Sequence, residues 1–520
     1  MGQPSAREQL MLELINRARL NPQADFNAYL TSYNPPNSSD PDIRSALTFF
    51  RVNGPVLLAQ INALTPVAPV AWNSALADAA TAHSQLMINN DQQGHQFPGE
   101  ADLGVRTTAA GYSRFSSLGE NVFAFTDSIL QGHAGFMVDW GNSPTGIQTP
   151  PGHRINILGE AFREVGLSVL TESNPATDVG PLVVTQDFGA RFGTGAFLLG
   201  VAYNDLDGNR FYTEGEGRGG LALSLTRSGI VTNLQTQSAG GFAQEAAAGN
   251  YVMRFTGAGL PVPLEISLAV AQANIKVDVI GVDMIAASAT FGMLSGVARG
   301  QLLGRLDGNI TGNALNNILD GNPGANLLDG GAGIDTAIYQ GPRSGYAITA
   351  PPVIAVIGAP VVREINDLTP GRDGRDTLTN VERVQFTDGV LAFDTQHTDN
   401  AGRGYLIYRA AFDRVPDPEG LGYWIRELDR GQDFGAVVAA SFIASEEFIR
   451  LNGANTSNAQ FVNLLYQNVL HRAGEAEGVA YWLGELNNGG ARSNMLASFA
   501  VSAENVNNVA PLISDGIFFV

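Results

Sequence analysis

The stretch TPPGHRINILG, residues 149–159, places a single histidine, His153, in a setting that suggests a function. Two prolines and a glycine precede this histidine, and an arginine and several apolar residues follow it. Three roles are open for such a side chain: catalytic base, ligand of a metal ion, or structural histidine. The choice depends on which other polar groups of the chain could meet it.

The length and the charge of the chain narrow its class. With 520 residues, of which 44% are hydrophobic, the chain is long enough for three or four domains with buried cores. The formal net charge of −20 disfavours binding to nucleic acid or anionic membranes, and it favours cations such as Ca²⁺ as partners. The absence of cysteine excludes disulfides, thiolate zinc sites and thiol nucleophiles. No apolar run reaches the roughly 18 residues that a transmembrane helix needs, so no membrane span is predicted.

Hydrophobic periodicity and turn residues divide the chain into segments. Helical patterns at 7–30, 73–90 and 128–140, followed by strand-like runs at 164–170 and 181–188, predict an α/β sandwich. Short strand-like runs, a segment rich in Gly and Asn, and a helical segment come next. The sequence therefore predicts a multidomain protein with an α/β domain at 1–195, a β-sandwich at 196–290, a β-roll with a trailing segment at 300–395, helices at 402–510 and a C-terminal segment at 511–520.

The helical segment contains a duplication. The stretch IYRAAFDRVPDPEGLGYWIRELDRG begins at Ile407, and LYQNVLHRAGEAEGVAYWLGELNNG begins at Leu465, 58 positions later. Tyr408 and Trp424 have counterparts at the same spacing in the second copy. Two stacked copies of one helical unit are predicted, with these aromatic side chains in the core.

Two more polar residues in the N-terminal domain stand in settings like that of His153. His95 lies in the Gly-flanked stretch QQGHQFPG, and Glu120 follows a glycine in SSLGENVFAF. Two imidazoles and a carboxylate that converge on one cavity could bind a divalent cation or perform acid–base chemistry. His83 and His133 fall within predicted helices and are expected to be hydrogen-bonded core residues.

Residues 7–190 resemble the CAP superfamily, which comprises cysteine-rich secretory, antigen 5 and pathogenesis-related proteins, in a cysteine-free bacterial form. The matching motifs, in chain order, are LELINRARLNP, PVAWNSALADAATAHSQLM, GH, GEN, GHRINIL, EVGLSV and VTQDFG. The resemblance implies an α-β-α sandwich whose central cleft is lined by two histidines and one or two acidic residues. These positions carry over to His95, His153 and Glu120.

The chain departs from the animal and plant pattern at the second acidic position. There a glutamate follows a tryptophan by three positions, whereas here Trp140 is followed by Ser143, and Glu164 is a candidate acidic neighbour. The loss weakens the case for a divalent cation in the cleft. The family implies binding of lipids, sterols or other partners rather than one reaction, and the chain contains neither H-E-x-x-H nor G-x-S-x-G. The enzyme question stays open, with a binding role preferred.

The stretch DLDGNRFYTEGE, residues 205–216, has the composition of a cation-binding loop. The candidate ligands are Asp205, Asp207, Asn209, the main-chain carbonyl of Phe211, and Glu216 at the twelfth position. A hard cation needs several oxygens on one tight loop, and this spacing supplies them. The glycine stands at the fourth rather than the sixth position, and the surroundings resemble calcium-binding β-sandwich repeats of bacterial surface proteins. We expect Ca²⁺ here, with a solvated acidic hairpin as the alternative.

The stretch GNALNNILDGNPGANLLDGGAGIDTAIY, residues 312–339, divides into nine-residue units that begin at Gly312, Gly321 and Gly330. These units resemble RTX nonapeptides, in which glycines permit tight turns, sixth-position oxygens and turn carbonyls hold Ca²⁺, and eighth-position apolar side chains fill a parallel β-roll. Asparagine replaces aspartate at two of the sixth positions, which predicts weaker calcium binding. The candidate ligands are Asn317, Asp320, Asn326, Asp329 and Asp335.

The resemblance to RTX proteins also implies a location. Such proteins leave Gram-negative cells through a type I channel with an uncleaved C-terminal signal, and they fold outside the cell, where Ca²⁺ is abundant. The tail LISDGIFFV, residues 512–520, has the character of such a signal, and no N-terminal signal peptide is recognisable. The leading hypothesis is an exported, calcium-binding, modular protein whose CAP-like domain binds an extracellular lipid, glycan or protein. An extracellular hydrolase with the same cleft and a surface-layer or matrix attachment protein are the alternatives.

Overall fold

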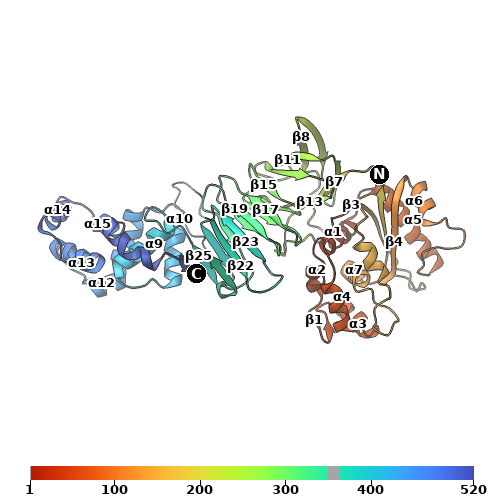
Figure 1. Cartoon of the computed structure of the whole chain (residues 1–520), viewed down its shortest axis with the longest axis horizontal. Coiled ribbons are helices and arrows are strands. Elements are labelled where there is room, and N and C mark those ends of the chain that lie inside the picture. The colour runs from red at the N-terminus through yellow and green to blue at the C-terminus, as the bar shows by residue number, and fades with distance from the viewer. Residues whose placement is uncertain (1, 350–361) are drawn as a thin grey trace. The chain divides into compact units, whose positions relative to one another are not determined.

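A four-stranded sheet forms the centre of the N-terminal domain (Figure 1). The computed structural model describes residues 2–349 and 362–520, and residues 350–361 of the predicted roll segment lie outside the described residues. In spatial order the sheet consists of β3 (Ala71–Trp72), β5 (Glu164–Thr171), β6 (Leu182–Arg191) and β4 (Phe115–Thr126). The first pair is parallel and the other two pairs are antiparallel. The remaining elements are α1 (Ala6–Leu20), α2 (Pro22–Tyr29), α3 (Pro41–Phe49), α4 (Gly54–Asn62), α5 (Ser74–Asn90), α6 (Leu103–Ala109), α7 (Ile129–Val138), α8 (Gly152–Ile157) and the short pair β1 (Ser32–Tyr33) and β2 (Pro36–Asn37).

Helices cover both faces of this sheet because its strands alternate apolar residues between the two sides. Val122 of β4 is buried in a cluster with Met87 of α5. The next residue, Phe123, points to the other face, where its ring contacts Phe136 of α7 edge-on at 6.1 Å. Helix α5 approaches β5 closely at Gly166, where a Cβ atom would lie 2.0 Å from the main-chain nitrogen of Ala77. The N-terminal part is therefore an α/β domain with helices on either side of the sheet.

Local capping explains where the predicted helices begin and end. The predicted helix at 7–30 is two helices, because Pro22 cannot continue the first and the Asn21 side chain caps the second by accepting from Ala24 N–H. The helix predicted at 73–90 is α5, and Asn73 is its N-cap. The helix predicted at 128–140 ends earlier, because Asp139 adopts a left-handed conformation with φ of 58° at the C-cap of α7.

Two sheets form the β-rich middle region that follows in the same compact unit, Met1–Gly331 with Pro370–Thr377. The first sheet contains β10 (Gly241–Ala246), β7 (Ala196–Tyr203), β13 (Ile275–Ile280), β14 (Met284–Ala287), β16 (Arg299–Leu302) and β18 (Ile318–Asp320). The second contains β19 (Asn326–Asp329), β17 (Gly308–Thr311), β15 (Phe291–Met293), β12 (Leu264–Val270), β11 (Gly249–Thr256), β8 (Ala222–Arg227) and β9 (Ile230–Gln235). Strand β23 (Arg375–Thr379) follows later in the chain.

The pairing changes from mainly antiparallel to parallel at β14. From this strand on, successive strands alternate between the two sheets, and β16 pairs in parallel with β14 and β18, as β17 does with β15 and β19. Paired residues of the later coils, such as Gly308 and Asn326, are 18 or 19 positions apart. The eighth-position residues Leu319, Leu328 and Ala337 are fully buried. The sheets therefore continue without a break across residues 290–300, where the sequence suggested a domain boundary.

Asparagine side chains form hydrogen bonds between successive coils. Asn322 donates from Nδ2 to the carbonyls of Leu306 and Leu303 in the preceding coil, at 2.9 and 3.4 Å. Asn313, nine positions earlier, does the same with Val297 and Leu294, at 2.7 and 2.6 Å. A side-chain amide thus supplies donors to these turn carbonyls.

The second compact unit comprises Ala332–Thr369 and Leu378–Val520. Its strands are β20 (Thr336–Ile338), β21 (Tyr346–Thr349), β22 (Val362–Asp367), β24 (Arg383–Phe386), β25 (Gly389–Ala392) and β26 (Ile517–Phe519). Its helices are η1 (Arg343–Gly345), α9 (Asn400–Phe412), α10 (Pro418–Asp429), η2 (Phe434–Ala439), α11 (Ala440–Ala444), α12 (Glu446–Asn452), α13 (Asn458–Leu470), α14 (Ala476–Asn487), α15 (Arg492–Ala500), α16 (Ala503–Val509) and η3 (Ala510–Leu512). None of the helices in the described ranges of the chain is long and apolar enough to cross a membrane.

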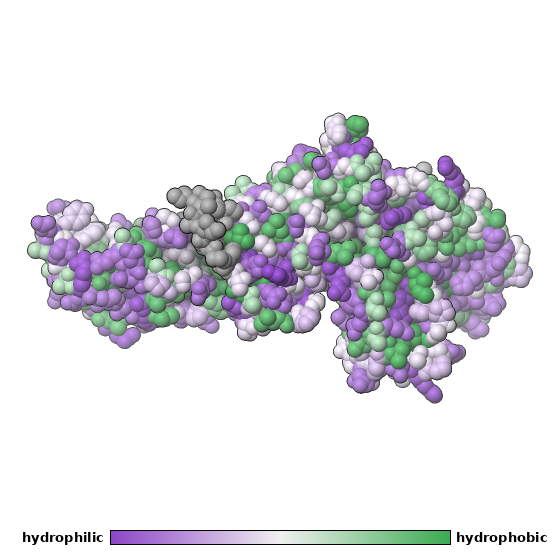
Figure 2. All heavy atoms as spheres, in the orientation of Figure 1, coloured by the Kyte–Doolittle hydropathy of each residue, from purple (hydrophilic) through white to green (hydrophobic). Residues whose placement is uncertain are grey.

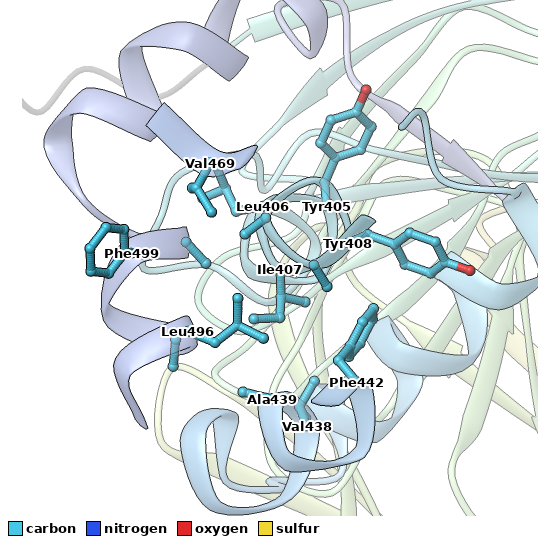
Figure 3. Close-up of a cluster of buried hydrophobic side chains, with 14 of the residues drawn as sticks. Tyr405, Leu406, Ile407, Tyr408, Val438, Ala439, Phe442, Val469, Leu496 and Phe499 are labelled. Carbon is cyan, nitrogen blue, oxygen red and sulfur yellow. The ribbon is translucent and has the colours of Figure 1, made fainter. Parts of the chain in front are cut away.

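The two sequence copies make equivalent contacts in this helical region. The Tyr408 hydroxyl donates to Asp417, and the Tyr466 hydroxyl donates to Glu475. Trp424 lies in the partly buried shell of the core, and its ring packs against Phe442 in the cluster shown in Figure 3. The predicted core role of these aromatic residues therefore agrees with their packing.

Strand β26 lies within the segment 511–520 that the sequence suggested as an export signal. It pairs antiparallel with β25, and Ile517 and Phe519 are buried. The apolar character of this tail thus has a folding role, because alternate side chains enter the core of the second unit.

The asparagine pairs lead to a stability prediction. Asn322→Asp replaces two buried N–H donors with a carboxylate that faces carbonyl oxygens, so we expect the free energy of unfolding to fall by roughly 1–3 kcal/mol. The measurement is urea denaturation of the full chain in the presence of a chelator. Asn233→Asp, at an exposed position of β9, adds the same charge and is the control. Equal stability of the two variants would contradict the role of the amide.

Candidate functional site

His153 lies in a polar contact that the sequence did not reveal. Its Nδ1 is 2.8 Å from Oδ1 of Asp139, and its main-chain N–H donates to Oδ2 of the same carboxylate at 2.9 Å. Asp139 is fully buried, whereas the side chain of His153 is 20% exposed. A carboxylate at Nδ1 favours the tautomer that carries the proton there, so Nε2 is left as an acceptor.

The loop that contains His153 is held by a buried arginine. The Arg19 guanidinium of α1 donates to the carbonyls of Ile157, Gly159 and Phe162 at 2.6, 3.1 and 3.3 Å. Arg19 also donates to Ala68 at 2.7 Å, and its own accessible surface is zero. Burial lowers the pKa of Arg19 to about 9, which still leaves the group charged near neutral pH. The contacts fix the end of α8 and the segment that follows it.

An aromatic pocket of about 380 Å³ opens beside His153. Phe50 and Trp140 stack nearly parallel in its wall, with ring centroids 6.3 Å apart, and Phe136 packs against the His153 ring at 5.3 Å. His153 is the only titratable side chain of the lining. The other lining residues are Gln93, Val122, Phe123, Phe125, Gly135, Gly141, Asn142 and Gln148. Sequence reasoning missed this pocket because its walls come from segments that are far apart in the chain.

His95 and Glu120 form a second pair. His95 Nδ1 is 2.9 Å from Oε1 of Glu120, and the other carboxylate oxygen contacts the Arg106 guanidinium. Arg106 also reaches Glu100 at 3.2 Å. Desolvation and the Arg106 charge lower the pKa of His95, although 61% of its side chain is exposed. Arg106 therefore holds the carboxylate that sequence reasoning assigned to the cleft.

His95, Glu120 and His153 do not form a compact ligand set. Within residues 2–349 and 362–520, the only three His, Asp or Glu side chains whose ligand atoms all lie within 4.8 Å of one another belong to another site, the loop 205–216. Asn121 links the two pairs, because its Nδ2 donates to the His153 carbonyl at 3.1 Å and it follows Glu120 on β4. The structure thus places the predicted cleft residues in two separate pairs. His153 pairs with Asp139, and His95 pairs with Glu120, which also contacts Arg106. Neither Asp139 nor Arg106 was predicted.

The other two predicted cleft residues have local structural partners. The Ser143 hydroxyl donates to the carbonyl of Ile147 at 2.7 Å and accepts from its N–H at 3.1 Å, which closes a turn. Glu164 accepts from Arg191 at 2.8 and 2.9 Å, from Asn73 at 2.7 Å and from Tyr112 at 3.0 Å. Neither residue lines the pocket.

His83 and His133 are buried and hydrogen-bonded. His83 contacts Glu100 and the Gly94 carbonyl at 2.7 and 2.8 Å. His133 contacts Asp25 at 2.9 Å, and both side chains are fully buried. These positions are those of structural histidines, as their helical settings indicated.

Asp187 is a buried carboxylate that sequence reasoning missed. It lies on β6 opposite Glu120 of β4, has no exposed surface, and neither side-chain oxygen has a hydrogen-bond partner within the described part of the chain. Burial raises the pKa of Asp187 to about 7, while the nearby Arg106 charge acts in the opposite direction. The only signal in the sequence was its place in the VTQDFG motif.

The loop 205–216 brings its predicted acidic ligands together. Asp205, Asp207 and Glu216 each offer a carboxylate oxygen within 4.8 Å of the others. Glu216 is 3% exposed, and it accepts main-chain N–H groups of Leu206 and Thr213, both at 2.8 Å. Such bonds fix the carboxylate while leaving lone pairs for a cation. The oxygen donors fit a hard cation such as Ca²⁺.

Asn209 and Phe211 complete the predicted loop. The Asn209 side-chain oxygen accepts from Phe211 N–H at 2.6 Å, and its Nδ2 donates to Asp207 at 2.7 Å. The Phe211 side chain packs at the edge of the N-terminal core, with the Arg17 guanidinium 4.6 Å above its ring. The loop is therefore attached to the α/β domain as well as to its own strands.

The predicted ligands of the roll have other partners. Asn317 accepts from Asn313 N–H at 2.7 Å, and Asn326 accepts from Asn322 N–H at 2.8 Å, so each side chain closes a turn. The remaining three residues are placed as follows. Asp320 forms an ion pair with Arg210 at 2.9 Å, Asp329 accepts from Gly331 N–H at 3.2 Å, and the main-chain N–H of Asp335 donates to Glu382 at 2.8 Å.

Two family models match parts of this chain, and the first agrees with the predicted CAP-like domain at its N-terminus. Residues 12–188 match the family model described as the cysteine-rich secretory protein family, CAP. Residues 439–509 match a model described as a domain of unknown function, DUF4214, within the segment 402–510 that was predicted to be helical. A search of curated proteins finds no match.

Several solved structures are similar to part of this chain, among them three that are 12–23% identical to it. An extracellular protein containing an SCP domain from Bacillus anthracis is 23% identical, with a TM-score of 0.19, over 29% of this chain and 40% of that one. An outer surface protein from Borrelia burgdorferi is 14% identical, with a TM-score of 0.19, over 30% of this chain and 96% of that one. Venom allergen-like protein 4 from Schistosoma mansoni is 12% identical, with a TM-score of 0.17, over 29% and 90% of the two chains.

The buried Asp187 predicts a pH dependence of stability. Because folding raises the pKa of this carboxyl from an ordinary value of 3.8 to about 7, the folded state binds the proton more tightly than the unfolded chain does. The stability contributed by that proton is fully present below about pH 4 and is lost as the pH rises to about 7.

The variant Asp187→Asn cannot titrate at this position. We expect it to be more stable than the unsubstituted protein at pH 8, by up to about 4 kcal/mol, and close to it at pH 4. Thermal unfolding at the two pH values measures the difference. Asp78→Asn, an exposed position on α5, is the control. A gain that is the same at both pH values would rule out this cause.

Proposed function

We propose that this protein acts outside the cell and that its CAP domain binds a small ligand with an apolar body in the aromatic pocket beside His153. The observation that carries the proposal is the pocket itself, about 380 Å³ in volume, with aromatic walls and one titratable group. Ligand pockets have this character: mostly apolar surfaces with a few placed polar groups, and volumes of roughly 300–1,000 Å³.

His153 supplies the polar contact of the proposed pocket. With Asp139 at Nδ1, the free Nε2 accepts a hydrogen bond from a ligand hydroxyl or amide. Gln93, Asn142 and Gln148 add neutral donors and acceptors to the lining. A lipid-like or sterol-like molecule with one hydroxyl group matches this combination better than a highly charged ligand does.

The family match supports the proposed extracellular location of the protein. The model that residues 12–188 match describes a secretory family. On the face of the molecule in Figure 2, hydrophilic and hydrophobic residues are interspersed on the surface of the N-terminal domain. The proposed ligand is therefore one that the protein meets in the extracellular space.

The alternative, hydrolysis, has one supporting observation. The Asp139–His153 pair has the geometry of an oriented general base. The Ser143 hydroxyl is engaged by Ile147, and no Ser or Thr lines the pocket, so a reaction would have to use a water molecule as its nucleophile. Binding without turnover requires nothing beyond the residues of the pocket.

We also propose that the loop 205–216 binds Ca²⁺ and that the ion stabilises the junction between the CAP domain and the middle region. The support is the cluster of Asp205, Asp207 and Glu216. Arg210 extends from this loop to Asp320 of β18, while Phe211 reaches Arg17 of α1. An ion that orders the loop would thereby order contacts on both sides of it. An RTX-like character of the parallel coils is part of the same proposal.

The pocket can be tested at its rim. Phe125 lines the pocket and is 45% exposed, so Phe125→Ala removes apolar contact area with little effect on the core. We expect it to weaken binding of a fluorescent sterol or a dansylated fatty acid about tenfold, which corresponds to about 1.4 kcal/mol of binding free energy. Fluorescence titration measures the affinity.

The control is Phe192→Ala, because Phe192 is 65% exposed and does not line the pocket. Equal losses in the two variants, or no binding of either probe, would contradict the proposal. Turnover of an ester substrate that disappears in Asp139→Asn would instead support the hydrolase.

The calcium site predicts a metal-dependent stability. At a free Ca²⁺ concentration of about 100 times the dissociation constant, binding should stabilise the folded protein by about 2.7 kcal/mol. Calorimetric melting in Ca²⁺ and in chelator measures this difference, and Asp207→Asn should reduce it, with one fewer site in a binding titration. Glu214→Gln changes a charge in the same loop outside the cluster and is the control. Identical melting curves with and without Ca²⁺ would refute the site.

A further inference from the structure

The only lysine of the chain lies in a buried cluster with two carboxylates. Lys276 of β13 has its Nζ 2.8 Å from Oε2 of Glu13 on α1, and it also contacts Oδ2 of Asp278. The side chains of the three residues are 5%, 4% and 8% exposed. The cluster lies at the seam between the CAP domain and the middle region, and neither the pocket nor the calcium loop uses it.

The two carboxylates have complementary settings. Oε1 of Glu13 accepts from the Gln9 amide at 2.8 Å, while its Oε2 faces the amine. Oδ1 of Asp278 accepts from the main-chain N–H of Val201 at 3.0 Å, and its other oxygen also faces the amine. Each acid therefore has one oxygen fixed by a donor and one oxygen against Nζ.

The charges of this cluster are costly to bury. Two carboxylates and one ammonium leave a net negative charge away from water, which favours a proton on one of the acids. Burial raises the pKa of Glu13, with the nearby Asp278 acting in the same direction and Lys276 opposing. Burial and Asp278 thus favour a proton on Glu13. Burial lowers the pKa of the Lys276 amine, but the two carboxylates outweigh this effect and raise it, and Asp278 is the proton acceptor in contact with Nζ.

We propose that the side chains of Lys276 and Glu13 condense to form an intramolecular amide bond, an isopeptide cross-link between α1 and β13. The 2.8 Å separation of Nζ and Oε2 keeps the reacting groups in contact, so that the reaction needs no encounter step. Burial of all three groups limits the access of the water that would compete in the reverse direction.

The atoms of the step balance with water as the only by-product. The Lys276 ammonium gives one proton to the Asp278 carboxylate, and the Nζ lone pair then forms a bond to Cδ of the Glu13 carboxyl. The C=O electron pair moves to Oε1, where the Gln9 amide stabilises the oxyanion. Asp278 protonates the Oε2 hydroxyl, which leaves as water when the C=O bond re-forms, and Asp278 then takes the surplus proton from nitrogen. The product is an amide beside a neutral Asp278, with no charge left in the buried cluster.

Glu13 rather than Asp278 is the acylated group. The Gln9 donor at Oε1 is placed for a developing oxyanion, and Asp278 is then available as the proton carrier. The resulting bond joins positions 13 and 276, so it closes a loop that contains most of the core of the CAP domain. A covalent cross-link between distant positions restricts the unfolded chain, which is how a disulfide stabilises a protein, and this chain has no cysteine.

Mass spectrometry of the full-length protein tests the cross-link. We expect the intact mass to be lower than the sequence mass by one water molecule. Trypsin should then release the peptide 8–17 joined to the peptide 255–299, uncut at Lys276. Because the chain has a single lysine, an amine-reactive reagent added to the unfolded protein should label only the N-terminus.

Glu13→Leu is the matched variant, because it retains Lys276 and Asp278 and lacks the acceptor. It should show the full sequence mass and a lysine that reacts after unfolding. The proposal is overturned if the unsubstituted protein has the full sequence mass and a reactive lysine. It is equally overturned if the lost water maps within the peptide 255–299 alone, or if Glu13→Leu still loses water, because Asp278 would then be the acylated residue.

Discussion

The buried guanidinium of Arg19 is the contact on which the geometry of the N-terminal domain depends. A charged group with no exposed surface must use its donors inside the protein, and Arg19 directs them to carbonyls of four separate residues. Three of those carbonyls belong to the end of α8 and the turn after it. The orientation of α8 determines where His153 lies, so a residue of the first helix sets the position of a side chain more than a hundred residues later. Removal of this one side chain would leave several carbonyls without a donor and would free the segment that carries the histidine.

The sequence predicts individual elements well where the relevant contacts are local. Asn73 and Asn21 act through main-chain groups two or three residues away, so their capping roles follow from the sequence around them. His95 and Glu120 were assigned to one site through the family resemblance, and they are in contact. The same reasoning failed for the partner of His153. Asp139 contacts His153 because the chain turns sharply after α7. No sequence pattern around Asp139 and Trp140 predicts this turn.

The missed carboxylate changes the chemistry expected of the cleft. The sequence suggested Ser143 because this residue occupies the position of a glutamate in the family pattern. The carboxylate that contacts His153 instead belongs to Asp139, four positions before Ser143. An acid at Nδ1 orients an imidazole, whereas an acid placed beside Nε2 would compete with a ligand for it. The observed arrangement therefore leaves the histidine available to the pocket. The two predicted histidines lie in separate pairs, each with its own carboxylate.

In the parallel coils, the choice between aspartate and asparagine determines which groups can hold the turns together. Aspartate at a sixth position offers only acceptors, so the turn carbonyls that face it need a cation to bring them together. Asparagine offers acceptors and donors together. The sixth-position Asn317 and Asn326 each accept a main-chain N–H that closes the turn. The second-position Asn313 and Asn322 donate to carbonyls of the preceding coil. A nine-residue spacing alone cannot distinguish the two cases, because glycines and interior apolar positions are common to both. In this chain the amides at the second positions supply donors to turn carbonyls of the preceding coil, which an aspartate at the same position could not do.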